Sequence, residues 1–536
     1  MTAPVVLAAF NARYAHASGA LRALAANWDG SRPLVLVEGT LEDDPVRFAG
    51  RLLEHEPALV AFSVHLWSAR PTAHAARVLR RVRPDLPLMA GGPEFFGEDG
   101  DGDGDGDGGS DGNGDGGGGG DAPHPITGLV DLVVRGEADL AFPGLCEALI
   151  TSGPAAGAGA ARIVTCPPPD LAAVRLPIDA FSDADLAHRV CYVETSRGCP
   201  MRCAFCTAAG TGVTTSPVVR TFPADRVLAQ LQALWDRGLR RYKFLDRSVH
   251  LGDYRPVLEW LLSRPEPVFV HLELTPHRLE SELAFLLAEF PPGALQIEIG
   301  VQTLSPEVAR AVGRPLTDVV AETLEYCVHE TDAHVHADLI AGLPGETPAS
   351  FADSFDRLLA TGVHELQLGI LKRLPGTRLC ALMPGTWFNP EPPYDVLFTD
   401  TFPFEELARL KVMARFWDLV ANSGNFHDAT ALLLAGPSPF AAFSAFSEWL
   451  NGATGRRTHG IELNRLAGLL YSYLTEVRGL DPDAARAALT ADFDRCGRAA
   501  RPAFLQGPAH DPPESPTPPE SPTPGRQRRH RPPKDA

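Results

Sequence analysis

The sequence predicts an α/β chain that continues into a mainly helical domain and ends in a disordered tail. Short apolar runs alternate with helical segments over residues 4–150, and the alternation restarts at residue 192 and continues to residue 371. Helical periodicity prevails from residue 377, and the composition is rich in proline, serine and threonine beyond residue 499. We therefore expect domains at 1–150, 189–376 and 377–498, a linker at 151–188 and a disordered tail at 499–536.

The composition indicates a globular protein of a reducing compartment. The chain has 536 residues, 44% of them hydrophobic, and its nine cysteines are odd in number and mostly scattered, unlike a disulfide framework. The sequence shows neither an uncharged apolar run of about 18 residues nor a signal-peptide pattern, so we expect a cytoplasmic protein that does not enter a membrane. The formal charge of -19 argues against a nucleic-acid partner and favours a small-molecule substrate.

The first unit is predicted to form a doubly wound parallel sheet. Its strand-like runs lie at 4–10, 34–37, 58–64, 86–90 and 129–134. Ligands of such sheets bind outside the carboxyl ends of the strands, so the residues that follow the runs are binding candidates. These candidates are His16, Gly19, Ser63, Gly91, Gly92, Gly136 and Glu137.

An acidic, glycine-rich insert at 97–121 interrupts this unit. It contains Asp-Gly repeats and five consecutive glycines. An EF-hand calcium loop needs a glutamate at its twelfth position, which no register of the insert supplies. We expect a flexible insertion that is too polar to offset the entropy lost on ordering.

Three cysteines directly behind the run at 192–195 form the most informative motif. Cys199, Cys203 and Cys206 have the spacing C-x3-C-x2-C. Thiolates suit zinc or iron–sulfur clusters, and three of them leave one metal coordination position free for a substrate or cofactor. A zinc loop completed by a distant His or Cys is the alternative, although this spacing is not among the usual zinc patterns.

The second unit contains six βα repeats. Its strand-like runs lie at 192–195, 241–245, 268–274, 294–299, 335–340 and 365–371. Reactive groups of βα barrels gather at the carboxyl ends of the strands. The polar and apolar candidates there are Asp246, Glu273, Glu298, Gln302 and Leu371.

The cysteine motif, preceded by Ser-Arg-Gly and carrying Phe205 before its last cysteine, resembles the radical S-adenosylmethionine (SAM) superfamily. The resemblance implies a partial (β/α)6 barrel and a [4Fe–4S] cluster on Cys199, Cys203 and Cys206 whose fourth iron binds SAM. It also implies reductive cleavage of SAM to methionine and a 5′-deoxyadenosyl radical, with an external one-electron reductant. The residues that it places near SAM are Asp246 at the amino group, Glu298 and Gln302 at the ribose and methionine parts, Phe205 and Leu371 at adenine, and Glu273.

The first unit resembles the cobalamin (B12)-binding domain that precedes many radical SAM domains. His16-x-x-Gly19, Ser63 and Gly91-Gly92 follow the order of that family's motifs, but Tyr14 replaces its aspartate and His65 replaces its leucine. The resemblance implies cobalamin binding by His16, Gly19, Ser63, Gly91, Gly92, Gly136 and Glu137. Coordination of cobalt by His16 is left open, and a flavodoxin-like sheet that merely packs against its neighbour is the alternative.

The C-terminal third resembles the helical domain of unknown function that follows the barrel in one subgroup of B12-dependent radical SAM proteins. Together the resemblances imply a cobalamin-dependent enzyme that cleaves SAM and methylates an unactivated carbon of its substrate. A SAM-dependent rearrangement without methyl transfer, and a non-catalytic sensor that binds the cluster or cobalamin, are the alternatives. The residues do not identify the substrate.

Overall fold

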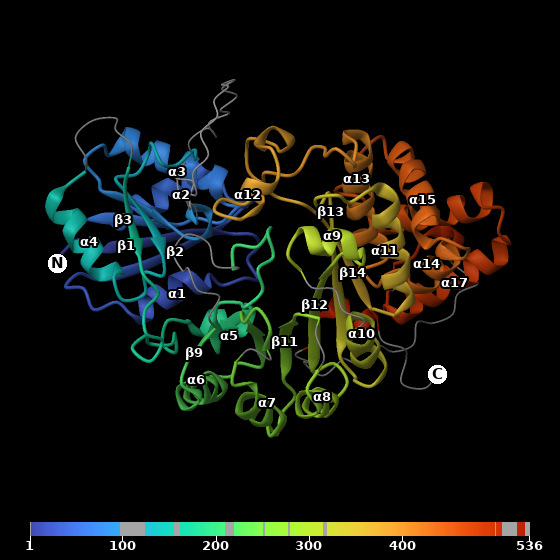
Figure 1. The fold of residues 1–536 in the computed structure, drawn as a ribbon, viewed down its shortest axis with the longest axis horizontal. Helices are drawn as coiled ribbons and strands as arrows, with labels where there is room; N and C mark the ends of the chain where they lie inside the picture. The colour runs from blue at the N-terminus through green and yellow to red at the C-terminus, as the bar shows by residue number, and fades with distance from the viewer. Residues whose placement is uncertain are drawn as a thin grey trace, which may run out of the picture.

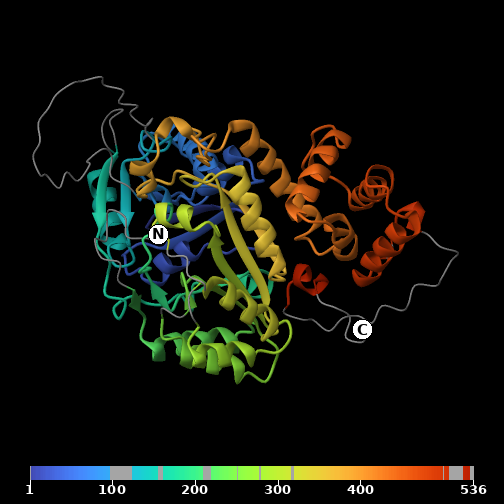
Figure 2. The ribbon, with the colours of Figure 1, turned by 45° about the vertical axis from the view of Figure 1, so that its right-hand side comes forward.

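The computed structural model describes residues 2–96, 124–154, 161–208, 219–249, 252–276, 279–314, 319–498, 500–505 and 523–530. The predicted flexible insert at 97–121 lies outside these residues. In the described part, an N-terminal sheet and a C-terminal helical domain flank a central barrel on opposite sides (Figures 1 and 2).

The N-terminal sheet is parallel, with strand order β2-β1-β3-β4-β5-β6. Its strands are β1 (Val5–Asn11), β2 (Leu34–Thr40), β3 (Leu59–Ser63), β4 (Leu88–Gly91), β5 (Leu132–Gly136) and β6 (Arg162–Cys166). All seven residues of β1 are buried, as expected for a central strand covered on both faces. Helices α2 (Pro45–Leu53) and α3 (Ala69–Val82) pack on one face, and α1 (Gly19–Ala26) and α4 (Phe142–Ser152) on the other. The predicted doubly wound sheet is confirmed.

The sixth strand corrects one expectation. Residues 162–166 lie within the segment 151–188 that we expected to be a linker, yet they pair with β5 in parallel register, with Val164 opposite Val134. The prediction was wrong here because β6 is a five-residue edge strand whose side chains are mostly exposed, and its apolar stretch is only Ile163-Val164.

The barrel sheet is also parallel, with strand order β14-β13-β12-β11-β10-β7. Its strands are β7 (Cys191–Val193), β10 (Arg241–Phe244), β11 (Phe269–Leu274), β12 (Leu295–Gln302), β13 (His334–Ala341) and β14 (Glu365–Ile370). The helices between them are α6 (Ala224–Asp236), α7 (Tyr254–Leu262), α8 (Ser281–Ala288), α9 (Pro306–Ala311), α10 (Val319–His329) and α11 (Pro348–Ala360). Because β7 and β14 are the two ends of this strand order, the barrel is open on one side. The six predicted βα repeats are confirmed.

Local signals explain where these elements begin. Helix α11 starts after Thr347, whose hydroxyl accepts a hydrogen bond from Ser350 N, and it has Pro348 at its first position. Helix α5 (Asp183–His188) starts with a capping box between Ser182 and Asp185. The short strands β8 (Ser196–Arg197) and β9 (Arg220–Thr221) pair in antiparallel register beside the cysteine loop.

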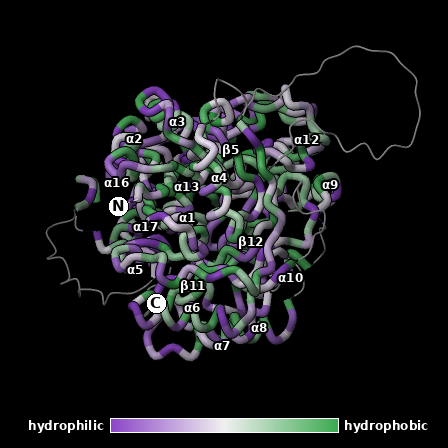
Figure 3. The backbone as a smooth tube through the Cα atoms, turned by 90° about the vertical axis from the view of Figure 1, so that its left-hand side faces the viewer, coloured by the Kyte–Doolittle hydropathy of each residue, from purple (hydrophilic) through white to green (hydrophobic). Residues whose placement is uncertain are grey.

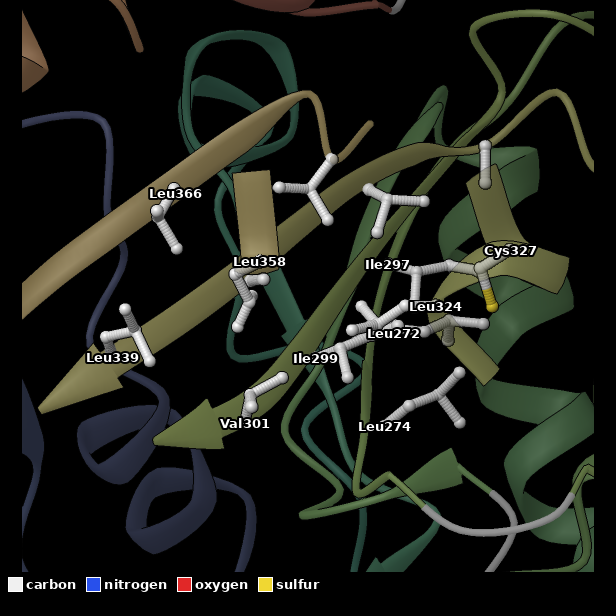
Figure 4. Close-up of a cluster of buried hydrophobic side chains, with 14 of the residues drawn as sticks. Leu272, Leu274, Ile297, Ile299, Val301, Leu324, Cys327, Leu339, Leu358 and Leu366 are labelled. Carbon is white, nitrogen blue, oxygen red and sulfur yellow. The ribbon is translucent and has the colours of Figure 1, made fainter. Parts of the chain in front are cut away.

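Side chains of the barrel strands alternate between an apolar and a polar face. Ile297, Ile299 and Val301 of β12 are buried together with Leu272 and Leu274 of β11 and with residues of α10 (Figure 4). The intervening positions carry polar groups. These are His271, Glu273, Gln296, Glu298, Gln302, His334, His336 and Asp338. The apolar face forms the core under the helices, and the polar face lines the inside of the barrel.

The C-terminal domain closes the free edge of β14. Its elements are α12 (Leu379–Leu382), η3 (Gly385–Trp387), α13 (Phe404–Val420), α14 (His427–Leu434), α15 (Pro439–Ala453), α16 (Leu463–Ser472), the π-helical turn η4 (Tyr473–Val477) and α17 (Pro482–Arg495). The indole Nε1 of Trp417 donates to Leu366 O over 2.8 Å, and the Asn422 amide bonds both backbone groups of Leu366. The domain is mainly helical, as predicted.

Part of the predicted disordered tail is ordered. Within 499–536 the structure describes η5 (Ala503–Leu505) and α18 (Gly525–Arg529). The Arg526 guanidinium lies 2.8 Å from the buried Glu365 carboxylate and 2.9 Å from Asp418. Residues 523–530 therefore differ from the expected solvated tail because their basic side chains find buried and half-exposed acidic partners on the barrel and α13.

Hydrophobic and hydrophilic residues are interleaved along the described chain (Figure 3). Within it, no single helix is long and apolar enough to cross a membrane; α14 and α15 satisfy the length and composition test as a pair bent by 108°.

Candidate active site

A cavity of about 810 Å³ lies between the N-terminal sheet and the barrel. The sheet contributes apolar residues to it, among them Leu7, Ala61, Met89 and Val134. The cavity brings together most of the predicted cobalamin-binding residues and two predicted barrel residues: Gly19, Ser63, Gly91, Gly92, Gly136 and Glu137 with Cys199 and Glu273. Two candidate sites that are far apart in the sequence therefore share one cavity.

The backbone packing around Gly91 and Gly92, at the end of β4, restricts which residues fit there. Gly92 has φ +114°, and a Cβ there would lie 2.6 Å from Val64 O. A Cβ at Gly91 would lie 3.2 Å from Val134 O. The backbone thus requires glycine at Gly92 and leaves little room for a side chain at Gly91, whether or not a ligand is bound. Contacts between Gly91, Gly92 and cobalamin stay a prediction.

Two side chains at this cavity carry buried polar atoms that have no hydrogen-bond partner among the described residues. They are Ser63, through its hydroxyl, and Gln230, through both amide atoms. An unpaired buried polar group costs about 1–3 kcal/mol. These unpaired groups, the apolar lining and the predicted binding residues fit a large ligand that has both apolar and polar parts, as cobalamin has.

His16 is not among the residues that line the cavity. Its Nδ1 lies 2.7 Å from the Tyr192 hydroxyl, and its carbonyl accepts from Arg189 Nη2 over 2.8 Å. His65 lines the cavity instead and stacks on Trp67 with ring centroids 4.6 Å apart. Burial lowers the pKa of His65 to about 4, so its imidazole is neutral at pH 7. The described contacts of His16 hold the loop after β1 against the barrel, and cobalt coordination by it stays untested.

Arg197 connects the N-terminal sheet to the cysteine loop. Its guanidinium donates to Asp139 over 2.8 and 3.0 Å, to Glu137 over 2.9 Å and to Glu194 over 2.9 Å. Glu137 also forms an ion pair with Arg220. The carboxylate predicted to touch cobalamin is therefore already occupied by two arginines, and its described role is to fix the sheet to the barrel.

A second buried network fixes the same two parts. Arg22 of α1 pairs with Glu38 over 2.6 Å and with Asp185 over 3.0 Å. Arg189 pairs with the same two carboxylates over 2.7 and 3.0 Å. These four charged side chains form ion pairs between the N-terminal sheet and the segment that leads into the barrel. The ion pairs hold the walls of the cavity in place.

The cysteine loop is held by backbone contacts and by one arginine. Cys199 and Cys203 are 8% and 5% exposed, and Cys206 is half-buried. Ala204 N donates to Val312 O and Leu379 N donates to Ala204 O, each over 2.8 Å. Arg314 Nη1 lies 3.3 Å from the Cys203 sulfur. The barrel and α12 thus fix the loop from two sides.

The three thiols lie close enough to one another for their charges to interact. Burial is the main cause that raises the pKa of Cys199, and the nearby Cys206 and Cys203 add to it. In the described ranges, no group of three or more His, Cys, Asp or Glu side chains converges as ligands of one metal ion. A [4Fe–4S] cluster binds each thiolate at a different iron, so its ligands need not converge on one point.

Asp246 is buried and bound to the strand that leads into the cysteine loop. Its carboxylate accepts from Thr195 Oγ1 over 2.6 Å, from Ser196 Oγ over 2.5 Å and from Thr195 N over 3.1 Å. In this structure it therefore positions the start of the loop. The predicted contact to the SAM amino group stays a prediction.

Two neighbouring carboxylates inside the barrel have opposite preferences for a proton. Glu273 of β11 and Glu298 of β12 are direct register partners. Burial and the charge of Glu298 raise the pKa of Glu273 to about 7. Burial acts against ionisation of Glu298 too, but its hydrogen bond from His271 Nε2, 3.0 Å long, and nearby cations lower its pKa to about 2. Glu298 is thus an anion and Glu273 a group that titrates near neutral pH.

The other predicted SAM contacts lie around the barrel ends. Gln302 has φ +73°, and its Nε2 lies 2.7 Å from where a Cβ on Gly300 would be, so its side chain folds over that glycine. Leu371 is buried, and its carbonyl accepts from Val396 N over 2.8 Å. Phe205 packs against the barrel core. Their contacts to SAM are not tested by this arrangement.

A second cavity, of about 910 Å³, lies between β14, α13 and the loop after β1. Its walls come from all three parts of the chain, with apolar side chains such as Ile370 and Leu407. The charged groups that line it are Arg13, Asp395, Lys411, Arg415, Asp418 and Arg526, with His336 and His459.

Sequence reasoning missed several residues of the site. Arg197 stands inside the Ser-Arg-Gly that precedes Cys199, and Gln230 lies on the apolar stripe of α6. Both residues are unusual in the sequence: Arg197 places a charge next to a buried strand, and Gln230 places an amide at a core position of its helix. His65 follows the strand-like run at 58–64 and stands out only as a departure from the cobalamin-domain motif, whereas Arg314 gives no signal because only the fold brings it to Cys203.

Two families match this chain. Residues 193–358 match the radical SAM superfamily, and residues 385–513 match a family described as a protein of unknown function, DUF4080.

Two methyltransferases are similar over about two thirds of this chain. The chain is 24% identical over 387 residues to the 2-(S-pantetheinyl)-carbapenam-3-carboxylate methyltransferase of Streptantibioticus cattleyicolor. It is 22% identical over 386 residues to the cobalamin-dependent radical SAM methyltransferase TokK of Streptomyces tokunonensis. Each match covers 66% of this chain and 52% of the relative, so the chain spans about half the length of these proteins.

Solved structures share the fold. The cobalamin-dependent SAM radical enzyme OxsB, with aqua-cobalamin and SAM bound, has a TM-score of 0.56 at 13% identity, covering 91% of this chain and 78% of OxsB. The radical SAM methyltransferase TsrM from Kitasatospora setae has a TM-score of 0.53 at 16% identity, covering 70% and 75%. The chain therefore contains a radical SAM domain at residues 193–358, followed by a DUF4080 match at 385–513, and it shares the fold of OxsB and TsrM.

Proposed function

We propose that this protein is a cobalamin-dependent radical SAM enzyme that cleaves SAM reductively and methylates an unactivated carbon of a small-molecule substrate. One observation carries the proposal: the cavity between sheet and barrel contains Cys199 together with Gly19, Ser63, Gly91 and Gly92. Methyl transfer by this route needs cobalamin and the SAM-cleaving cluster within reach of one substrate. Both relatives described above are methyltransferases, which favours methyl transfer over rearrangement.

Cys199, Cys203 and Cys206 would hold the [4Fe–4S] cluster, and the N-terminal sheet would hold cobalamin. When bound, the reduced cluster supplies the electron that cleaves SAM, and methylcobalamin supplies the methyl group. The chain orients and shields these groups. Asp246 fixes Thr195 and Ser196 ahead of the cysteines, while Arg197 and Arg189 fix the cavity walls.

The polar face of the barrel would bind SAM. Glu298 is an anion at neutral pH, and its carboxylate suits an ammonium or hydroxyl donor of SAM. Phe205, Asp246, Glu273, Gln302 and Leu371 complete the predicted contacts. Glu273 faces the shared cavity and can take up a proton there near neutral pH. The second cavity, with walls from all three parts of the chain, gives a small substrate room beside the barrel.

An external one-electron reductant and a cytoplasmic location belong to the same proposal. The nine cysteines are all free thiols, which supports a reducing compartment. A non-catalytic sensor is the competing function, and it predicts that SAM is bound without being cleaved.

The deciding experiment is an assay for 5′-deoxyadenosine. The full chain is purified without oxygen, reconstituted with iron and sulfide, reduced, and incubated with SAM and hydroxocobalamin. We expect 5′-deoxyadenosine and methionine, and loss of the visible cluster absorbance in Cys203→Ala. Cys380→Ala, at a half-buried cysteine outside the loop, is the control and should keep the absorbance. A cluster-loaded protein that never forms 5′-deoxyadenosine would show that the sensor function is correct.

A further inference from the structure

Helix α6 carries an amide at a position where its own pattern requires an apolar side chain. Its buried face consists of Val227, Leu231, Leu234 and Trp235, with Gln230 among them. A core stripe of this spacing is normally filled by apolar residues, and glutamine is mostly exposed in folded proteins. Gln230 is therefore a buried polar group that needs an explanation.

The Gln230 amide has no partner in the part of the chain that the structure describes. The side chain is 0% exposed, and both Nε2 and Oε1 lack a hydrogen bond. Gln232, two residues further along the same helix, shows the contrast: its amide donates to Asp236 over 2.7 Å and accepts from Trp260 over 3.3 Å. The half-buried Gln232 therefore has partners for its amide, and the fully buried Gln230 has none among the described residues.

Gln230 lines the cavity between sheet and barrel. It shares this space with Ser63, whose hydroxyl is also unpartnered, and with Tyr192 and Cys199. An amide offers a donor and an acceptor side by side, and another primary carboxamide is a group that can satisfy both at once. Burial makes such a pair strong and its absence costly.

We infer that Gln230 binds a peripheral carboxamide of the corrin ring, so that the barrel supplies part of the cobalamin site. The inference rests on the proposed function, and the corrin ring of cobalamin carries primary carboxamides around its edge. It assigns to α6 of the radical SAM domain a contact with the cofactor that the N-terminal sheet holds. Cobalamin would then be fixed from both sides of the cavity, and its position relative to the cysteine loop would be set by the barrel itself.

The test is a titration of the full chain, reconstituted with its cluster and free of cobalamin, with hydroxocobalamin. Gln230→Met keeps the length of the side chain and removes both polar atoms. We expect its Kd for hydroxocobalamin to rise about tenfold, the equivalent of about 1.4 kcal/mol. The thermal midpoint of the cobalamin-free variant should equal or exceed that of the wild type, because no partner in the described chain is lost.

Gln232→Met is the matched control. It removes the half-buried hydrogen bonds of Gln232 on the same helix, so its thermal midpoint should fall while its Kd for hydroxocobalamin stays unchanged. Cobinamide, which has the ring carboxamides but not the nucleotide tail, separates the two parts of the cofactor: Gln230→Met should weaken it by the same factor. A loss confined to cobalamin would overturn the assignment to the ring.

Other outcomes are equally clear. An unchanged Kd in Gln230→Met, or a marked fall of its thermal midpoint, would overturn the inference and leave the proposed function standing. A wild type that binds neither hydroxocobalamin nor cobinamide would overturn the cobalamin part of the proposed function itself, and this inference with it.

Discussion

The guanidinium of Arg314 lies against the middle cysteine, with Nη1 3.3 Å from the Cys203 sulfur. A second nitrogen of the same group bonds Gly300 O, which fixes the orientation of the guanidinium between β12 and the cysteine loop. Hydrogen bonds and positive charge at a cluster sulfur stabilise the reduced, more negative cluster.

We expect Arg314→Met to lower the reduction potential of the reconstituted cluster by tens of millivolts. For one electron, about 59 mV corresponds to a tenfold change in the equilibrium constant. The measurement is a redox titration followed by EPR. Arg378→Met is the control, because Arg378 contacts the backbone of the same loop at Arg202 O and not a sulfur. A potential equal to that of the wild type would show that Arg314 acts on the loop and not on the cluster.

Arg197 should be the most costly single contact between sheet and barrel. In Arg197→Met the carboxylates of Asp139 and Glu194 lose their partner while Asp139 stays buried. Breaking one side of a buried ion pair costs about 3–5 kcal/mol. Denaturant unfolding of the full chain measures the loss, and hydroxocobalamin binding should weaken with it. The exposed pair Arg83–Asp85 gives the control, since solvent screens this pair and Arg83→Met should leave stability nearly unchanged.

Asp246→Asn distinguishes two roles of one carboxylate. The structure shows three hydrogen bonds from Thr195 and Ser196 to Asp246, so we expect the variant to hold less iron and sulfide after reconstitution because the start of the cysteine loop is no longer fixed. The measurement is iron and sulfide content per chain beside the Kd for SAM. Full cluster content with weakened SAM binding would contradict the positioning role and support the contact to SAM expected from the sequence.

The sequence was sufficient wherever the signal was local. The three cysteines lie within eight positions, and each barrel strand has an apolar run of its own. The cysteine loop and the six βα repeats could therefore be predicted. The hydrogen-bond and ion-pair partners of the site residues could not be predicted, because they lie far away in the sequence. Asp246 meets Thr195 across 51 positions, and Arg197 meets Asp139 across 58. Strand β6 was not predicted because it is a short edge strand with mostly exposed side chains. The loops after β1 and β3 pack so that His65, and not the predicted His16, lines the cavity.

Protonation of Glu273 should affect the stability of the folded chain even without cofactors. Its pKa in the folded chain, about 7, exceeds the ordinary value of 4.5, because burial and Glu298 oppose its charge. The folded protein therefore loses stability as the pH rises from about 4.5 to 7, and this loss is complete above pH 7. Glu273→Gln cannot ionise, so it should be more stable than the wild type above pH 7, by on the order of 3 kcal/mol, and nearly equal to it near pH 4.5.

Thermal midpoints of the cofactor-free full chain at pH 5, 7 and 8.5 measure this difference. The variant Glu289→Gln, at an exposed position at the end of α8, removes a carboxylate without this burial and should shift little at any of the three values. A constant difference between Glu273→Gln and the wild type across the range would mean that Glu273 is ionised throughout. In that case Glu273 would be an anion next to Glu298 at the cavity wall, and the barrel would have to balance two negative charges where SAM is expected to bind.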